Sequence, residues 1–254
     1  MTKLKLNVGR KPEPPRIILF GPNAIGKSTY LSKAKNHVIL DFENGLSQID
    51  CTRTDVIKDW ATLITTLGLL ASEPKDMDWL GIDSLEWLEH LIHQQVVNEA
   101  DSNKVKSIAD IGYGKGYAAA AVKWQYILHA LEYIRRTRNC GIVCVAHAEP
   151  YRIEPPDMDS YDQYQPALHK SARALLTEWC DELFYVGYKV HLRKEDMGYN
   201  KERALAIGSG ERYIRTQETP AIMAKSRLTL PAEIPFQWEY FVKQLTETNK
   251  KGTK

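Results

Sequence analysis

Short apolar runs alternate along the chain with longer segments whose apolar residues recur at helical spacing. The apolar runs are Ile17–Phe20, His37–Leu40, Trp79–Ile82 and Gly141–Ala146. The segments with helical patterning are 55–71, 84–100 and 117–138. A strand that is apolar throughout is typical of a parallel sheet that helices cover on both faces. The alternation therefore predicts an α/β fold with a mainly parallel sheet.

The last part of the sequence has a different pattern. Residues 148–165 are rich in proline, and we expect an irregular loop there that extends to about residue 170. A helix through Ala174 and Trp179 and a strand at Leu183–Val186 should follow. Residues 203–207 and 212–216, joined by Gly208-Ser-Gly210, are typical of an antiparallel hairpin. The sequence thus predicts a C-terminal antiparallel extension, followed by a short amphipathic segment around 236–245.

Length and composition favour one soluble domain. The chain has 254 residues without an obvious linker or repeat, so we expect a flexible lead-in at 1–15, one domain at 16–245 and a flexible basic tail at 246–254. Neither an apolar stretch of about 18 residues nor a signal-peptide pattern is present, which predicts a cytosolic protein. The 34 Lys and Arg nearly balance the 32 Asp and Glu. Overall charge therefore neither favours nor excludes a nucleic-acid partner.

The four cysteines are too few and too scattered for a disulfide scaffold. Cys140, Cys144 and His147 could suggest a metal site. A strand would instead place the two sulfurs on one face about 13 Å apart, too far to share an ion. We therefore predict that both cysteines pack in the core.

The stretch from Gly21 to Thr29 fits the phosphate-loop pattern G-x-x-x-x-G-K-[ST], between a predicted strand and a predicted helix. Such a loop turns its backbone N–H groups toward phosphate oxygens. Lys27 is expected to reach the β and γ phosphates, and the Ser28 hydroxyl to bind Mg²⁺. The predicted nucleotide-binding residues are Gly21, Pro22, Asn23, Ala24, Ile25, Gly26, Lys27, Ser28 and Thr29. The loop predicts ATP and Mg²⁺ as cofactors.

Hydrolysis also needs an acid near the metal and a group that activates water. Asp83 ends a predicted strand, where it can hold Mg²⁺ together with Ser28. For the water we considered Glu43, Glu86 and Glu89. Glu86 and Glu89 lie along a predicted helix that leads away from the sheet. Glu43 follows the second strand, and parallel strands share one carboxyl edge, so Glu43 is the predicted base.

Five short motifs, within residues 16–231, resemble those of RecA-like ATPases. They are Asp41-x-Glu43-x-Gly45, Ile82-Asp83-Ser84, Tyr113-Gly-Lys-Gly-Tyr117, Ala146-His147 and Ala224-Lys225-Ser-Arg227. More narrowly, the sequence resembles the phage-borne Sak group of the fourth type, which are core-only proteins of single-strand annealing. The resemblance implies a RecA-like P-loop core for the domain at 16–245. It also places the protein in the cytoplasm of a bacterial host.

The resemblance assigns roles to further residues. His147 would be a polar sensor of the γ-phosphate at the end of the fourth strand. The loop that follows would contact single-stranded DNA, since aromatic rings stack on bases and cations track phosphates. The candidates there are Tyr151, Arg152, Tyr161, Tyr164 and Lys170. Five acidic residues in the same loop dilute its positive charge.

Lys225 and Arg227 lie two residues apart and point the same way if the chain is extended. In RecA-like assemblies such a pair reaches into the nucleotide site of a neighbouring subunit. We lean to this role because no other arginine is evident near the phosphate loop. The resemblance therefore implies a homo-oligomer, either a ring or a filament.

Two functions follow as hypotheses. The first is an ATPase that acts on single-stranded DNA in homologous recombination or strand annealing. The second is a nucleotide-gated binding or loading module for a replication partner or a single-strand-binding protein, with slow hydrolysis. A small-molecule kinase is a weaker third reading, because no arginine-rich lid segment is evident.

Overall fold

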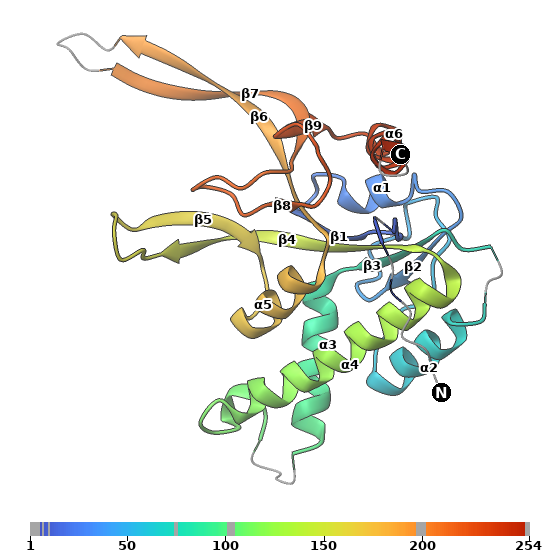
Figure 1. Cartoon of the computed structure of the whole chain (residues 1–254). Helices are drawn as coiled ribbons and strands as arrows, with labels where there is room; N and C mark the ends of the chain where they lie inside the picture. Colours follow the sequence, from blue (N-terminus) through green and yellow to red (C-terminus); the bar gives the residue numbers. More distant parts are fainter. Residues whose placement is uncertain are drawn as a thin grey trace.

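A mainly parallel sheet forms the centre of the molecule (Figure 1). The computed structural model describes residues 6, 8–9, 11–73, 76–100, 105–196 and 202–251, and it describes side chains in all of these except 191–196, 202–208 and 249–251. The strand order along the sheet is β2-β3-β4-β1-β6-β7-β9. The first five of these strands are β2 (His37–Asp41), β3 (Trp79–Asp83), β4 (Gly141–Ile153), β1 (Arg16–Gly21) and β6 (Glu182–Asp196). They run parallel, which confirms the predicted α/β fold class.

Helices cover both faces of the sheet, because each central strand is apolar on both sides. Ile18 and Phe20 of β1 pack with the helices on one face, whereas Ile17 and Leu19 point to the other. The first face is covered by α2 (Trp60–Leu70), α3 (Leu85–Asn98), α4 (Lys115–Arg138) and α5 (Lys170–Trp179). The second face is covered by the short α1 (Lys27–Leu31) and by α6 (Trp238–Lys251). A short 3-10 helix, η1 (Ile108–Asp110), precedes α4.

The segment that we predicted as an irregular loop is largely a β-hairpin. β4 continues to Ile153 and pairs with β5 (Tyr161–Pro166), and α5 then begins at Lys170. The prolines misled the sequence reading because they usually break strands. Beyond His147, however, β1 no longer borders β4, so Pro150 lies in a strand with a free edge. A proline without an N–H donor is tolerated at such a position.

The predicted hairpin within 203–216 is also wrong. β6 is much longer than expected, and its partner is a single strand, β7 (Glu202–Arg215), so that the two form a projecting ribbon (Figure 1). The pairing shifts between Tyr188 and Val190, opposite the glycines of β7. Gly210 has a φ of +73°, which marks a bulge in the strand rather than its turn. Residues 197–201, between the strands, lie outside the described part.

Two short strands complete the sheet, β8 (Lys225–Ser226) beside β6 and β9 (Glu233–Pro235) beside β7. This antiparallel group confirms the predicted C-terminal extension. Two helix boundaries differ from our expectation. α2 begins only at Trp60, because the Asp59 carboxylate accepts the Thr62 N–H at 2.8 Å and caps the helix. α6 continues to Lys251, past the predicted domain end at 245, and 252–254 lie outside the described residues.

The cysteines and the lead-in give different outcomes. Cys140 and Cys144 are fully buried, which confirms core packing. At the lead-in, Glu13 and Pro14 are held by Arg135 of α4, so the ordered chain starts before the predicted boundary at 16. In the described part of the chain, no helix has the length and apolar character that crossing a membrane requires.

Candidate nucleotide site

The phosphate loop joins the end of β1 to the start of α1, as the sequence predicts. Gly26 precedes the helix with a φ of +100°, a conformation that suits glycine. Ala24 adopts a φ of 57°, although it stands where many such loops have glycine. This left-handed turn strains a residue with a side chain but remains accessible to it. The loop therefore has the tight backbone that phosphate binding needs.

Lys27 is buried beneath this loop. Its Nζ donates to the carbonyl oxygens of Gly21 at 2.9 Å and Pro22 at 2.8 Å. Burial lowers the pKa of Lys27 to about 8, against the opposing pull of nearby carboxylates, Glu86 first among them. A phosphate group beside the ammonium would stabilise its charged form. Lys27 is thus placed to pair with an anionic ligand.

Ser28 and Asp83 meet at the floor of the same cleft. The Ser28 side chain forms a hydrogen bond with the Asp83 carboxylate. Burial raises the pKa of Asp83, and the charges of Glu43 and Asp41 act in the same direction. A hydroxyl and a carboxylate oxygen are the hard ligands that Mg²⁺ takes in proteins, together with water and substrate phosphates. The residues present therefore fit the predicted metal site, and a bound Mg²⁺ would neutralise charge on phosphate oxygens.

Glu43 is set by a turn at the end of β2. The Asp41 carboxylate accepts the backbone N–H groups of Glu43 at 3.1 Å and of Asn44 at 2.7 Å. The Phe42 N–H bonds to the Asp83 carbonyl oxygen at 3.0 Å and ties the ends of β2 and β3 together. Glu43 itself is exposed and lines the cleft. Glu43 and Asp83 thus lie in the same cleft, as the shared carboxyl edge of the parallel strands predicts.

His147 stands at the end of the sheet core, opposite Gly21 in the β1–β4 register. Glu86 holds it from α3, because one carboxylate oxygen accepts the His147 backbone N–H and the other lies 3.6 Å from Nδ1. We expected Glu86 to point away from this edge, and that expectation is wrong. Glu86 lies in the first turn of α3, which starts directly at the end of β3. Its closeness to the strand follows from this short connection.

One cleft of about 280 Å³ gathers these groups. Its walls are Ala24, Gly26, Lys27, Ser28, Thr29, Asp41, Glu43, Gly45, Ile49, Asp83, Val145 and His147. A cation, a hydroxyl and several carboxylates thus converge at the carboxyl edge of a parallel sheet, which is where ligands bind in open α/β folds. The predicted loop, metal, water-activating and sensor residues lie together. Their roles stay predictions.

Sequence reasoning missed an arginine at the phosphate loop. Arg212 of β7 donates from Nη1 to the Ile25 carbonyl oxygen at 2.9 Å, and its guanidinium lies 5.1 Å from the Phe236 ring centre. A side chain at Gly26 would meet this same nitrogen at 2.6 Å. Our premise that the chain has no arginine near the loop is therefore wrong. The sequence around Arg212 does not indicate this contact with Ile25, because the contact depends on the register between β6 and β7.

Arg212 should support nucleotide binding by holding the loop in shape. We expect Arg212→Ala to weaken ATP binding by about tenfold, the typical effect of losing a hydrogen bond from a charged donor. Titration with a fluorescent ATP analogue measures this effect. Arg215→Ala serves as the matched control, because Arg215 lies on the same strand but pairs with Glu233. Equal affinities of the Arg212 variant and the wild type would contradict the assignment.

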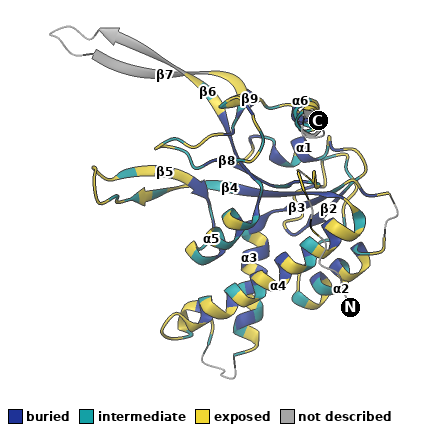
Figure 2. Ribbon diagram, viewed as in Figure 1, coloured by how far each residue is buried: buried dark blue, intermediate teal, exposed yellow. Residues whose placement is uncertain are grey.

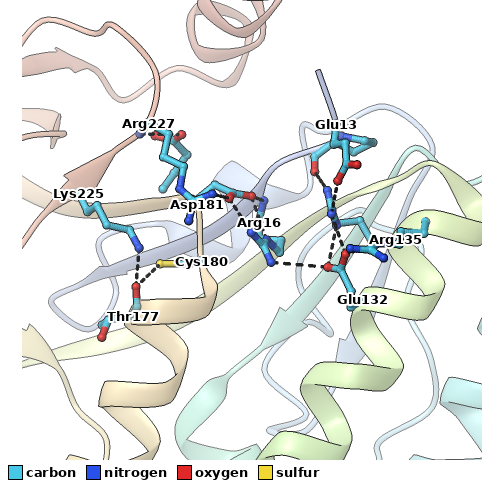
Figure 3. A network of polar contacts seen from close by, with 12 residues as sticks. Glu13, Arg16, Glu132, Arg135, Thr177, Cys180, Asp181, Lys225 and Arg227 are labelled. Carbon is cyan, nitrogen blue, oxygen red and sulfur yellow. Dashed lines mark hydrogen bonds and ion pairs between the residues drawn. The ribbon is translucent and has the colours of Figure 1, made fainter. Parts of the chain in front are cut away.

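The structure does not bring Lys225 and Arg227 to this cleft. Arg227 Nη1 lies 3.0 Å from Asp181 Oδ1, and the Lys225 ammonium donates to the Thr177 carbonyl oxygen (Figure 3). Asp181 immediately precedes β6 and also binds Arg16, the first residue of β1. Both cations therefore lie at the amino edge of the parallel strands, opposite the phosphate loop.

Arg135 belongs to the same side of the molecule. It is buried and pairs with Glu132 at 2.8 Å and Glu13 at 2.6 Å (Figure 3). Its pKa is raised because it donates side-chain hydrogen bonds to these carboxylates. Arg135 thus serves as an anchor between α4 and the lead-in.

Two buried carboxyls predict a pH effect on stability. Burial raises the pKa of Glu89 and of Glu182 to about 7 from a usual 4.5. Between these values the folded state binds more protons than the unfolded state, so the contribution of these groups falls as pH rises from 5 to 8. His93 acts in the opposite direction below neutral pH, since burial lowers its pKa to about 4. The pH dependence of the wild type combines these opposing effects, so a variant without the two carboxyls is needed to isolate their contribution.

We expect the double variant Glu89→Gln Glu182→Gln to lose less stability than the wild type between pH 5 and pH 8, by on the order of a few kcal/mol. Urea unfolding at pH 5, 6.5 and 8 measures this difference. Glutamine keeps an acceptor for the Arg227 and His169 N–H groups that now bind the carboxylates. Parallel pH curves for the two proteins would contradict the prediction.

The predicted DNA residues lie on the β4–β5 hairpin and at the start of α5. Tyr151 is half-buried under Arg173, whose guanidinium lies 3.7 Å from its ring centre. Arg152 pairs with Asp162 at 3.5 Å, and both are exposed. Tyr161 is half-exposed, and Tyr164 and Lys170 are exposed. The structure gathers these side chains near one projection without joining them into one cluster.

The loop, the cleft and the sheet edge define a P-loop nucleotide-binding protein. A family model described as an AAA domain, AAA_24, matches residues 13–228. The chain therefore belongs to the AAA_24 family of AAA domains. This membership supports the predicted P-loop ATPase class and, with it, ATP and Mg²⁺ as cofactors.

Solved structures also match the chain. One of them is the RadB recombinase, with a TM-score of 0.42 and 14% identity over 84% of this chain and 91% of that chain. A likeness at this level says nothing about what this chain binds. No curated protein matches the sequence. The Sak group and a phage origin stay predictions.

Proposed function

We propose that the protein is an ATPase that acts as an oligomer on single-stranded DNA in homologous recombination or strand annealing. The observation that carries this proposal is the continuity of β4. It runs from the buried sheet past His147 at the cleft and directly into the β4–β5 hairpin. A change at the phosphate end of the nucleotide would reach the hairpin without an intervening flexible joint.

The catalytic groups of one chain divide the work as follows. Lys27 would bind the β and γ phosphates, and Ser28 and Asp83 would hold Mg²⁺, which would neutralise charge on the phosphate oxygens. The Glu43 carboxylate orients the attacking water and takes its proton. His147, held by Glu86, reports the γ-phosphate to the hairpin. All these side chains line the cleft or, for Glu86, support a residue that does.

Lys225 and Arg227 would complete the site of a neighbouring subunit. The six residues of β1 separate the two edges of the sheet, which amounts to about 16–20 Å at the usual rise per residue. Arg227 therefore cannot reach the phosphate loop of its own chain. Its side chain is 60% exposed and so is available to another subunit. Such a head-to-tail contact generates a ring or a filament.

The ATPase rate with and without single-stranded DNA tests the proposal. We expect DNA to increase the rate and ATP to increase the sedimentation coefficient of the protein. Duplex DNA of the same length is the control for nonspecific electrostatic binding. A protein that stays monomeric with ATP and ignores single-stranded DNA would contradict the proposal.

The charge of the hairpin supports a second candidate, a nucleotide-gated module for a replication or single-strand-binding partner protein. Residues 148–166 carry Glu149, Glu154, Asp157, Asp159 and Asp162 but only one cation, Arg152. Such a segment repels DNA phosphates and suits a basic protein surface.

A hairpin variant separates the two candidates. The triple change Asp157→Asn, Asp159→Asn, Asp162→Asn should strengthen binding to single-stranded DNA if the hairpin contacts DNA. The same change should weaken capture of a purified single-strand-binding protein if the hairpin contacts a protein. Stronger DNA binding by this variant would therefore favour the first candidate, and weaker capture of the protein would favour the second.

A further inference from the structure

Three planar side chains are stacked beside the phosphate loop. The rings of Tyr30 on α1 and of Phe236, directly after β9, lie with centres 4.6 Å apart and planes 14° apart. The guanidinium of Arg212 lies over the Phe236 ring, 5.1 Å from its centre, and donates to the loop at the Ile25 carbonyl oxygen. Three elements that are far apart in the sequence thus meet at one side of the loop. We call Tyr30, Phe236 and Arg212 the loop stack.

The inner end of the loop stack is anchored in the core. Tyr30 is buried and packs edge-on against Trp238 of α6, with 5.3 Å between the ring centres. Phe236 is half-buried, whereas Arg212 is exposed. The buried colours of the central strands likewise give way to exposed ones where the β6–β7 ribbon leaves the sheet (Figure 2). Exposure therefore increases along the stack, and its most exposed member is a flat cation.

The sheet order places the loop stack on the side where the nucleoside should lie. β1, which leads into the phosphate loop, has β4 on one side and β6 on the other. Asp83, Glu43 and His147 lie at the ends of β3, β2 and β4, so they are all on one side of β1. These are the groups proposed for the metal, the water and the γ-phosphate. The γ end of a triphosphate on the loop would therefore face this side, and its nucleoside end would face β6 and β7, the side of Arg212.

The phosphate loop lies directly against the loop stack. A Cβ at Gly26 would meet Arg212 Nη1 at 2.6 Å and would lie 3.7 Å from Phe236 Cε1. Within the described part of the chain, no carboxylate forms an ion pair with Arg212, whereas Arg215 on the same strand is paired with Glu233. The guanidinium is thus held by the loop and the ring without being neutralised. A flat cation that is already fixed can stack on another flat ring with little loss of side-chain freedom.

We propose that the exposed face of the Arg212 guanidinium stacks on the base of the bound nucleoside triphosphate, and that Phe236 and Tyr30 are positioning residues that hold the guanidinium. The inference rests on the proposed function, because it takes the ligand of the cleft to be a nucleotide. It adds a base contact to the loop contact of Arg212 described above. Guanidinium groups stack on aromatic rings and on nucleic-acid bases through their flat faces. Such a contact favours the larger purines over the pyrimidines.

Matched variants of the loop stack test the base contact in the full-length protein. Arg212→Lys removes the flat face but keeps a cation that can donate to the Ile25 carbonyl oxygen, and Phe236→Leu removes the ring under the guanidinium but keeps an apolar side chain. Each variant is titrated with a non-hydrolysable ATP analogue and with inorganic tripolyphosphate, which has no nucleoside, both with Mg²⁺. Competition against a fluorescent ATP analogue measures both affinities. Arg215→Lys is the control, because Arg215 lies on the same strand but pairs with Glu233.

Arg212→Lys should bind the ATP analogue about 2- to 30-fold more weakly, which corresponds to the loss of one cation–π contact. Phe236→Leu should show a loss in the same direction, because the guanidinium is no longer held. Both variants should bind tripolyphosphate with the wild-type affinity, since the phosphate loop is intact. Arg215→Lys should change neither affinity. If tripolyphosphate does not compete even with the wild type, the ratio of the affinities for ATP and UTP takes its place, and Arg212→Lys should lower that ratio.

The outcomes separate this inference from the proposed function. If Arg212→Lys weakens both ligands equally or neither of them, the base contact is wrong and the proposed function stands. If the wild type binds neither ligand, both fail. The assay contains no DNA, so a protein that ignores single-stranded DNA would contradict the proposed function and leave the base contact in place. Thermal unfolding checks the fold of each variant. Arg212 is exposed, so Arg212→Lys decides the test if Phe236→Leu unfolds early.

Discussion

Replacing Glu43 with glutamine should lower kcat for ATP hydrolysis by about 10²- to 10⁴-fold, the usual contribution of a positioned general base. ATP affinity should change little, because Glu43 lies in a turn after β2, outside the phosphate loop, and is exposed where it lines the cleft. Glutamine keeps the size of the side chain but cannot take the proton. Steady-state release of phosphate, measured beside equilibrium binding of ATP, tests both parts.

Glu86→Gln is the informative comparison for Glu43. Glu86 also carries a carboxylate near Lys27, but one of its oxygens accepts the His147 N–H and the other lies 3.6 Å from His147 Nδ1. We therefore expect a smaller loss of kcat in this variant. If Glu86→Gln abolishes hydrolysis and Glu43→Gln does not, the two carboxylates have the reverse roles.

The second large effect concerns Arg227. We expect Arg227→Ala to reduce ATP hydrolysis by about 10³- to 10⁵-fold, as the loss of an arginine finger does. The mutant should still bind ATP, since its own phosphate loop is intact. Mixing it with Lys27→Ala subunits, which are also inactive alone, should restore measurable activity. The interfaces that recover pair an intact phosphate loop with an intact Arg227 of the next subunit.

The control for Arg227 is another exposed arginine of the same molecule. Arg136 pairs with Glu132 and its side chain is 70% exposed, so Arg136→Ala should keep the wild-type rate. Arg212 provides the competing explanation, because it is the arginine at the loop in cis. If Arg212→Ala lowers kcat by as much as expected for Arg227 and mixing restores no activity, the arginine acts within one chain.

The sequence carried enough information for the centre of the fold and the main cleft. Continuous apolar runs such as Ile17–Phe20 are typical of parallel strands that are buried on both faces. Polar residues directly after such runs must collect at one edge, which places Asp83 and Glu43 beside Lys27. These inferences succeed because burial on both faces of a parallel strand leaves a strong local pattern.

The projecting strands left no comparable pattern. β4 beyond His147 and β6 beyond Gly187 leave the covered part of the sheet, and the residues at 148–153 and 188–190 are half-buried or exposed. Pro150 therefore led us to predict a loop, and Gly210 a turn. In the structure, Pro150 lies in a strand with a free edge and Gly210 lies at a bulge. The contact of Arg212 with Ile25 joins residues that are 187 positions apart. Such a contact requires the register of a long ribbon, which short-range patterns do not encode.

The ion pair between Arg227 and Asp181 is weak enough to break at little cost. Arg16 holds Asp181 Oδ1 at 2.7 Å and Oδ2 at 3.0 Å, so this carboxylate stays paired when Arg227 departs. The exposed contact with Arg227 is worth only about 0–1 kcal/mol. An unassembled subunit would thus keep its guanidinium on Asp181 and release it to a neighbour without leaving a bare buried charge. In assembly, the Arg227 guanidinium would leave Asp181 for the nucleotide site of the neighbouring subunit. In disassembly, it would return to Asp181, and this exchange could repeat with each round of nucleotide turnover.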